Sequence, residues 1–358
     1  MERGSMEEKE MERIPQMVQV LEALKEASHE IQRHHSPDSP ATKALLELHT
    51  ILSSSDPNLS ALYDHLRRLK TLLHSLHHST GLRSFLTRPL SSHSLSRVAA
   101  SIHSEIQAWI DRETLRALSA SLRSPNPHQD ELLALLTQFE DRVSQGFSRQ
   151  LQELILKHKL FSSLESVLLD AKFPNRVREQ AGVAVAALIR FNKDVFVGQV
   201  LMGPTVGALV SMGSVKSISV LCSLIRSIRS PLVDEIESNG EIPKVIAVLD
   251  SDDVGLRVAA LECVLEIGYF GRKEAVEAMM KEGLVEKLME LQRSEKGEGN
   301  RFGSCVARFA VQLEVGEGLR QREKRAFKPE ILGRVREASV SDAEAATVAA
   351  EVLWGSSP

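Results

Sequence analysis

A short motif recurs at nearly regular spacing through the second half of the chain and constrains its fold more than any other feature. Each copy has a small or apolar residue, two mostly apolar residues and a charged one, within a segment rich in Ala, Val and Leu. Successive copies are 36, 40, 42 and 43 residues apart. Internal repeats of about 40 residues are typical of stacked helical units. The copies are Ala187–Arg190, Ser223–Arg226, Cys263–Glu266, Cys305–Arg308 and Val348–Glu351.

Glycine and proline mark where the helices between these motifs begin. A glycine precedes an apolar helix at Gly203, Gly240 and Gly283. We expect these glycines to form the turns, since only glycine takes a positive φ at little cost. Prolines are expected near helix starts, where a missing N–H costs little, at Pro204, Pro243 and Pro329.

The first half of the chain predicts a different set of helices, separated by breaks rich in Ser and Pro. Apolar residues recur there at helical spacing, and no segment alternates like a strand for long. The expected helices are Met11–Ile31, Ala41–Leu52, Leu59–Leu76, Ser96–Leu122 and Leu132–Phe147. The sequence therefore predicts an all-α protein, with an N-terminal helical bundle in residues 1–150 and a repeat array in residues 151–356. Residues 1–10 are expected to be disordered.

Composition and charge exclude several classes of function. The net charge is −4, and residues 1–150 carry 17 Lys and Arg against 19 Asp and Glu. Without a basic excess in either half, nucleic acid is not an expected partner. We find no apolar segment long enough to span a membrane, no signal core and no cysteine framework, so a cytoplasmic or nuclear protein is expected.

The segment GEIPKVIAVL (Gly240–Leu249), followed by DSDDVGLRVAALECVLEI, resembles an armadillo repeat. Neighbouring repeats match less well, and the resemblance covers about five repeats from Leu151 to Trp354. It implies a right-handed α-solenoid whose third helices line a groove that binds a partner protein.

The first half is similar to the helical domain that precedes the U-box in plant armadillo ubiquitin ligases. The similarity rests on helix order and spacing from LYDHLRRLKTLLHSL through IHSEIQAWIDRE to DELLALLTQFEDRV. In that family a U-box with a Cys-Pro-Ile type segment separates the two parts. Here Phe147 runs almost directly into the repeats, and no cysteine precedes Cys222. The resemblance implies a relative without a U-box, to which ligase activity does not carry over.

The charged position of the repeated motif gives the candidate binding residues. A residue that recurs at one position of stacked repeats forms a ladder suited to an extended peptide. Solvated charges at helix ends are an equally good explanation, and the mixed signs argue against a uniformly acidic or basic ligand. The candidates are Arg190, Arg226, Glu266, Arg308 and Glu351.

Other reactive or charged residues favour structural explanations. The three cysteines lie among Val, Leu and Ala, so they are expected to be small buried residues. A catalytic thiol is not expected, because no histidine follows His158 to activate it. The spacing of His74, His77 and His78 suits a metal, yet no further ligand lies within a helical turn. We predict no catalytic site, metal or cofactor. Gly297–Gly303 indicates a loop. The basic run Arg320–Lys328 favours a solvated helix face over a site for an acidic partner or an importin.

Two functions compete on this sequence. The first is a non-enzymatic scaffold or adaptor that binds a partner protein along the groove, with no small-molecule substrate. The second is a component of the ubiquitin ligase machinery, which rests on the family resemblance alone. Ser36, Ser39 and Ser124 precede prolines and are either phosphorylation sites or loop residues.

Overall fold

The computed structural model describes residues 22–31, 40–51, 60–78, 82–124, 127–294 and 301–354. All regular secondary structure in these ranges is helical, which confirms the predicted all-α class. Contacts divide the chain into two compact units. Unit 1 comprises Met1–Ala120 and Ser148–His158, and unit 2 comprises Ser121–Phe147 and Lys159–Pro358. Residues 1–10, Ser36 and Ser39 lie outside the described ranges.

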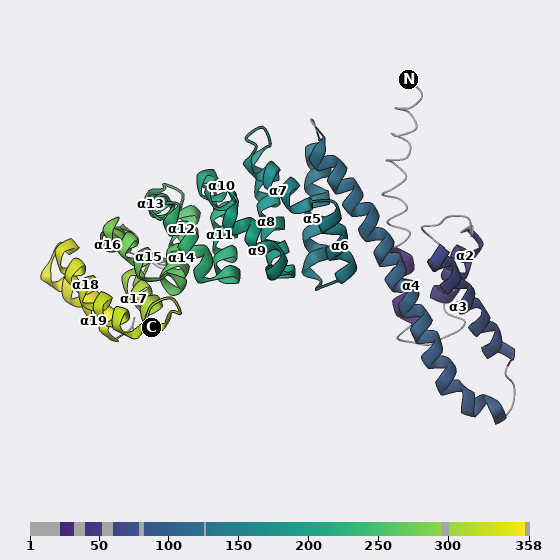
Figure 1. The fold of residues 1–358 in the computed structure, drawn as a ribbon. Coiled ribbons are helices and arrows are strands. Elements are labelled where there is room, and N and C mark those ends of the chain that lie inside the picture. The colour runs from purple at the N-terminus through teal and green to yellow at the C-terminus, as the bar shows by residue number, and fades with distance from the viewer. Residues whose placement is uncertain are drawn as a thin grey trace, which may run out of the picture. The chain divides into compact units, whose positions relative to one another are not determined.

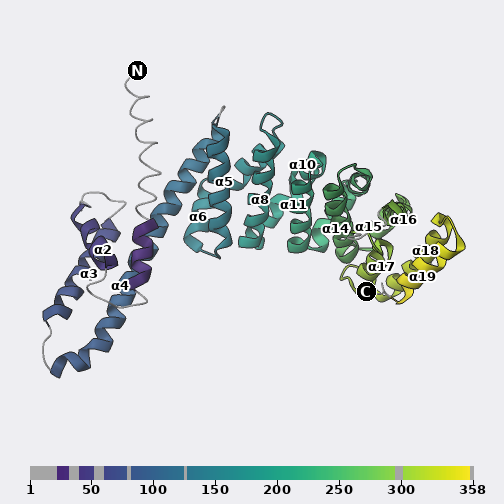
Figure 2. The same ribbon diagram turned by 180° about the vertical axis from the view of Figure 1, so that it is seen from behind.

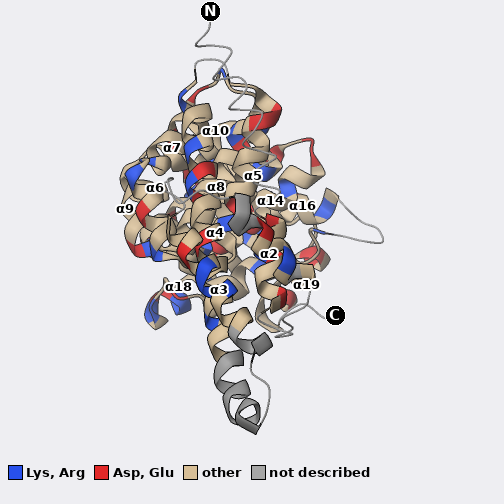
Figure 3. Cartoon of the chain, turned by 90° about the vertical axis from the view of Figure 1, so that its right-hand side faces the viewer, with Lys and Arg blue, Asp and Glu red and all other residues tan. Residues whose placement is uncertain are grey.

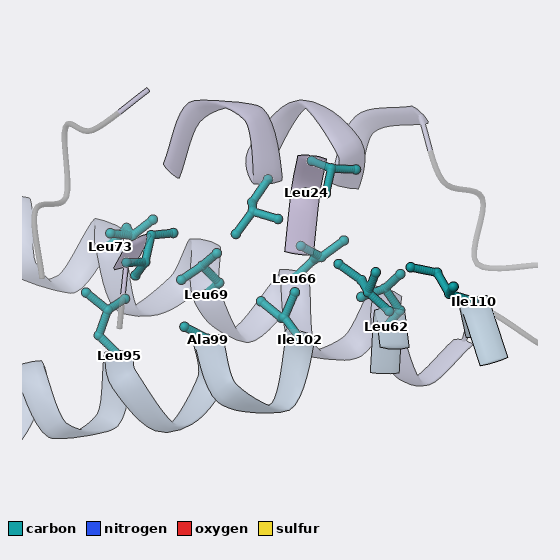
Figure 4. Close-up of a cluster of buried hydrophobic side chains, with 12 residues drawn as sticks. Leu24, Leu62, Leu66, Leu69, Leu73, Leu95, Ala99, Ile102 and Ile110 are labelled. Atoms are coloured by element: carbon teal, nitrogen blue, oxygen red, sulfur yellow. The ribbon is translucent and has the colours of Figure 1, made fainter. Parts of the chain in front are cut away.

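Unit 1 is a helical bundle around an aliphatic core. Its helices are residues 22–31, α2 (Pro40–Ile51), α3 (Ser60–His78), most of α4 (Leu82–Arg123) and α6 (Arg149–Lys157). The core residues of α3 recur every three or four positions, so one face of this helix is apolar. They pack with residues of the same spacing on α4 (Figure 4). The α3 and α4 core residues are Leu62, Leu66, Leu69, Leu73, Leu95, Ala99, Ile102, Ile106 and Ile110.

The main departure from the predicted helices in unit 1 concerns α4. This helix begins at Leu82 and not at Ser96, as the sequence suggested. The segment before Ser96 is rich in Ser and contains Pro89, and both residue types lower helix propensity. Because the prediction relied on local helix propensity, it placed the start of this helix too late in the sequence. The part of the predicted first helix before residue 22 lies outside the described residues.

Unit 2 is an armadillo-type α-solenoid, as predicted (Figures 1 and 2). In its central repeats two short helices lead into a third, and α8, α11, α14, α17 and α19 pack in succession, each against the next. The helices are α5 (Gln129–Ser144), α7 (Leu160–Leu169), α8 (Asn175–Phe191), α9 (Lys193–Met202), α10 (Thr205–Met212), α11 (Val215–Ile228), α12 (Ser230–Ser238), α13 (Ile242–Ala247), α14 (Val254–Phe270), α15 (Lys273–Lys281), α16 (Leu284–Ser294), α17 (Cys305–Val315), α18 (Gln321–Ala338) and α19 (Asp342–Trp354). A 3₁₀ turn, Val248–Asp250, extends α13.

Small residues let neighbouring helices of unit 2 approach closely. A Cβ atom on Gly182 would lie 3.1 Å from the side chain of Leu209, and one on Gly268 would lie 3.0 Å from the ring of Phe309. Ser214 caps α11 through a capping box, and the side chain of Asp253 caps α14 by accepting the N–H of Gly255 at 2.8 Å. These caps fix where two of the third helices begin.

The predicted glycine turns are correct at two of three positions. Gly240 and Gly283 have φ values of 67° and 72°, which other residues adopt only with strain. Gly203 has a φ of −100°, so the prediction is wrong there. Glycine is needed at this position for space, because a Cβ atom would overlap the carbonyl oxygen of Gln199.

The predicted positions of the prolines at helix starts are also correct at two of three residues. As expected, Pro204 lies immediately before α10, and Pro243 lies in the first turn of α13. Pro329 lies inside α18, so the predicted helix start at this residue is wrong. Its ring removes one backbone hydrogen bond to the carbonyl of Arg325. Both residues are exposed, so water can reach that carbonyl.

Helix α5 belongs to the contacts of unit 2, although the sequence assigned residues 1–150 to the N-terminal domain. It packs against α8, and Gln180 Nε2 donates a hydrogen bond to Glu140 Oε2 at 2.8 Å. Its apolar residues Leu136, Phe139 and Val143 are buried. The division by contacts therefore does not coincide with the expected boundary at residue 150.

Among the described residues, none of the helices taken singly has the length and apolar character needed to cross a membrane. One pair, α9 and α10, reaches both together, with a bend of 68° between its members.

Candidate protein-binding surface

The third helices of unit 2 carry one surface that runs from repeat to repeat. On α8 the outward residues are Arg176, Val183 and Arg190, spaced by seven residues. On α11 they are Val215, Ser219 and Arg226, spaced by four and seven residues. Such spacing places each set along one side of its helix. Helices α8, α11 and α14 lie side by side in chain order (Figures 1 and 2), so the outward sides of α8 and α11 are adjacent.

Two hydrogen bonds fix how α8 and α11 lie against each other. Lys216 Nζ donates to Gln180 Oε1 at 2.7 Å, near the beginnings of the two helices. Arg190 Nη1 donates to Ser223 Oγ at 2.9 Å, near their ends. Both bonds join the same pair of neighbours, so the two helices run in the same direction with their exposed residues in register.

The predicted residues Arg226 and Glu266 form a direct pair between α11 and α14. Arg226 Nε lies 2.7 Å from Glu266 Oε1, and the Arg226 side chain is 54% exposed. The hydrogen bond from this carboxylate raises the pKa of the Arg226 guanidinium. At this exposure we expect the pair to contribute no more than about 1 kcal/mol to stability.

The two remaining predicted residues do not extend the ladder. Arg308 Nη1 donates to the carbonyl of Arg301, in the turn before its own helix, at 3.2 Å. Glu351 Oε2 accepts from Gln292 Nε2 of α16 at 3.2 Å. The structure therefore joins Arg190 to Ser223 of the next repeat and Arg226 to Glu266 of the repeat after it, and it holds Arg308 and Glu351 in other contacts.

The difference has a geometric reason. Arg190 is the next-to-last residue of α8, which has 17 residues, whereas Arg308 is in the first turn of α17, which has 11. The motif copies match in sequence, yet they lie at different positions between the two ends of their helices. The role of all five residues in partner binding stays a prediction.

Sequence reasoning missed a polar relay that crosses three helices. Gln180 is buried, donates to Glu140 of α5 and accepts from Lys216 of α11. Its three members are 40 and 36 residues apart, close to the repeat period. That spacing was the available signal, and the assignment of α5 to another domain concealed it.

Predicted structural residues are buried as expected. Cys222, Cys263 and Cys305 are all buried and free of disulfides. A hydrogen bond to the Cys222 thiol, together with burial, raises the pKa of Cys263, and burial raises the pKa of Cys305 to about 12. The Cys263 and Cys305 thiols therefore stay protonated near neutral pH and are poor nucleophiles.

The sequence also singled out three closely spaced histidines, without predicting a metal, and a loop at Gly297–Gly303. In the described part of the chain, no group of three or more His, Cys, Asp or Glu could hold a metal ion. The side chains of His77 and His78 and residues 295–300 of the predicted loop lie outside what the structure describes. In the last part of this loop the ring of Phe302 is buried, and Arg257 Cζ lies 5.4 Å from its centroid.

The basic run predicted as a solvated helix face forms the first half of α18. Arg322 and Arg325 are exposed, in agreement with that prediction. Lys324 Nζ donates to the carbonyls of Glu314 and Gly316 at 2.9 and 2.7 Å, and Lys328 Nζ lies 3.2 Å from Glu314 Oε2. These two lysines therefore hold α18 against the end of α17.

Comparisons with known proteins give structural likenesses only. No family model matches the chain. No curated protein matches it either. A designed armadillo repeat protein in complex with the peptide (KR)4 is 18% identical, with a TM-score of 0.49; the match covers 67% of this chain and 98% of that one. A computationally designed armadillo repeat protein for modular peptide recognition is 19% identical, with a TM-score of 0.47 and coverages of 66% and 99%.

An engineered protein is similar over 96% of this chain and 98% of its own length, at 15% identity and a TM-score of 0.42. With every TM-score below 0.5, these likenesses say nothing about partners. The relation to plant U-box ligases stays a prediction from the sequence.

Proposed function

We propose that this chain is a non-enzymatic scaffold or adaptor that binds a segment of a partner protein across the third helices of unit 2. The proposal includes the predicted location in the cytoplasm or nucleus, since three free thiols suit a reducing compartment.

One observation carries the proposal. The exposed sides of α8, α11 and α14 are held in register by contacts between repeats, namely Arg190 with Ser223 and Arg226 with Glu266. A surface fixed in this way presents side chains at repeated intervals without ordering them on binding. Preorganisation of this kind lowers the entropic cost of holding an extended segment.

A site-specific photo-crosslinking experiment tests the proposal. The full chain would carry a benzoylphenylalanine at Ser219, an exposed position in the middle of α11, in cells that naturally express the protein. The matched control would carry it at Gln199, which is exposed on α9. We expect one partner protein, identified by mass spectrometry, to crosslink at Ser219 and not at Gln199.

Equal crosslinking at both positions would place the partner elsewhere and contradict the proposal. Absence of any adduct at Ser219, with the chain folded and expressed, would contradict it as well.

A further inference from the structure

Charge is distributed in bands along unit 2. Residues 171–229 contain eight Lys or Arg and two Asp or Glu, whereas residues 230–294 contain seven Lys or Arg and 14 Asp or Glu. The near-neutral charge of the whole chain conceals this separation. Because successive repeats are stacked in chain order, bands in the sequence are bands in space.

Four basic residues of the first band, residues 171–229, are exposed on α8 and α11. Arg176, Arg190, Lys216 and Arg226 are all exposed, and we call these four residues the basic face. Helix α8 contains one carboxylate, Glu179, and α11 contains none. The basic face therefore has an excess of positive charge that its own helices do not neutralise.

The contacts of the basic face leave most of its charge available. Arg190 and Lys216 are bonded to the neutral groups of Ser223 and Gln180. Among the described residues, Arg226 is the one member of the basic face that is paired with a carboxylate, that of Glu266 on α14. The basic face ends there, because α14 presents Glu262 and Glu266 on its outward side.

The positions of its residues along α8 and α11 give the size of the basic face. On α8, 14 residues separate Arg176 from Arg190, which corresponds to about 21 Å along the helix, and on α11 ten separate Lys216 from Arg226, or about 15 Å. Neighbouring helices lie about 8–10 Å apart. An extended segment of about seven residues covers 21 Å.

We propose that the basic face binds a short acidic segment of the partner protein, with Asp or Glu carboxylates placed on Arg176 and Arg190. The inference rests on the proposed function and adds the chemical class of the segment. Arginine forms two parallel hydrogen bonds with a carboxylate, so these residues suit such a ligand. A long polyanion such as RNA fits poorly, because it would run on over the carboxylates of α14.

Fluorescence polarisation with the full chain and labelled peptides tests this inference. The probes are an acidic octapeptide, (Asp-Glu)4, a basic octapeptide, (Lys-Arg)4, and a 20-nucleotide single-stranded RNA. We expect the acidic peptide to bind more tightly than the RNA, with an affinity that falls as salt rises. The double variant Arg176→Gln/Arg190→Gln should bind it about tenfold more weakly.

A matched variant controls for charge and fold. Arg322→Gln/Arg325→Gln removes the same charge from two exposed residues of α18, which is blue along part of its length in Figure 3. This variant should keep the affinity of the unaltered chain for the acidic peptide, and circular dichroism should show that both variants are folded. Binding of the basic peptide should be the same for both variants.

Three results would overturn the inference: no binding of the acidic peptide, tighter binding of the RNA, or an equal loss of affinity in both variants. The proposed function fails on a different result, the absence of a partner crosslinked at Ser219. A partner captured there through a basic or apolar segment would leave the function standing and remove only the acidic ligand.

Discussion

At the scale of single residues, Gly318 shows a close backbone approach that no other residue type could make. The loop between α17 and α18 lies on the end of α14, where the N–H groups of Glu317 and Gly318 donate to the carbonyl of Tyr269 at 2.8 and 3.2 Å. A Cβ atom on Gly318 would overlap the backbone of Gly271 and lie 2.5 Å from the carbonyl oxygen of Phe270. The loop is therefore fixed to a neighbouring repeat through its glycine.

We predict that Gly318→Ala lowers the free energy of unfolding by about 2 kcal/mol or more, because the backbone of Gly271 cannot move aside cheaply. Gly333→Ala is the control, since that glycine lies in α18 with no atom within 4 Å of the added Cβ. It should raise stability by about 0.5–1 kcal/mol, through helix propensity. Urea unfolding measures both, and equal effects would contradict the geometry.

Cys305 gives a prediction about pH. Burial raises its pKa from 9.0 to about 12, so the folded protein binds a proton that the unfolded chain releases between these values. Stability from this group is complete below pH 9 and is lost as pH rises towards 12. The unfolding free energy of the unaltered chain should therefore fall relative to that of Cys305→Ala between pH 8 and 10.5. Parallel pH profiles of the two proteins would refute this assignment.

At the scale of helices, α18 combines a proline with interactions that fix its first half. Pro329 removes a backbone hydrogen bond from the helix interior, while Lys324 and Lys328 bond to the end of α17. The sequence predicted a helix start at this proline because local propensity disfavours it inside a helix by about 3 kcal/mol. Contacts with α16, α17 and α19 supply the stabilisation that the helix alone lacks.

Replacing this proline tests that account. We expect Pro329→Ala to raise the free energy of unfolding by about 1–3 kcal/mol, because it restores the missing hydrogen bond. Pro243→Ala, at the start of α13, should be neutral or slightly destabilising, since proline is well accommodated there. Thermal unfolding of the two variants provides the comparison, and a loss of stability in the first would show that the ring is required for packing.

At the scale of the whole molecule, two separate compact units make a single unfolding transition unexpected. Leu66 belongs to the core of unit 1 and Leu224 to the core of unit 2, and both are fully buried. Leu66→Ala and Leu224→Ala should each destabilise one unit by about 2–5 kcal/mol. In hydrogen-exchange mass spectrometry, each variant should lose protection in its own unit and keep it in the other. A uniform loss in both units would show that they unfold together.

The sequence by itself determined the helical class, the array and its approximate period. These follow from local causes: apolar residues at helical spacing, glycines at Gly240 and Gly283 that permit a positive φ, and a motif repeated about every 40 residues. The burial of the three cysteines was predictable too, because they lie among apolar residues of those helices.

Only the tertiary structure decided which residues of different repeats meet. The motif treats Arg190, Arg226, Glu266, Arg308 and Glu351 as equivalent, yet helix length places Arg308 near a helix start and Arg190 near a helix end. The packing of α5 against α8 and the relay through Gln180 depend on contacts across about 40 residues, which the preferences of neighbouring residues do not specify. Local sequence fixes a helix and its apolar face, whereas the relative position of two packed helices along their axes depends on side chains from both.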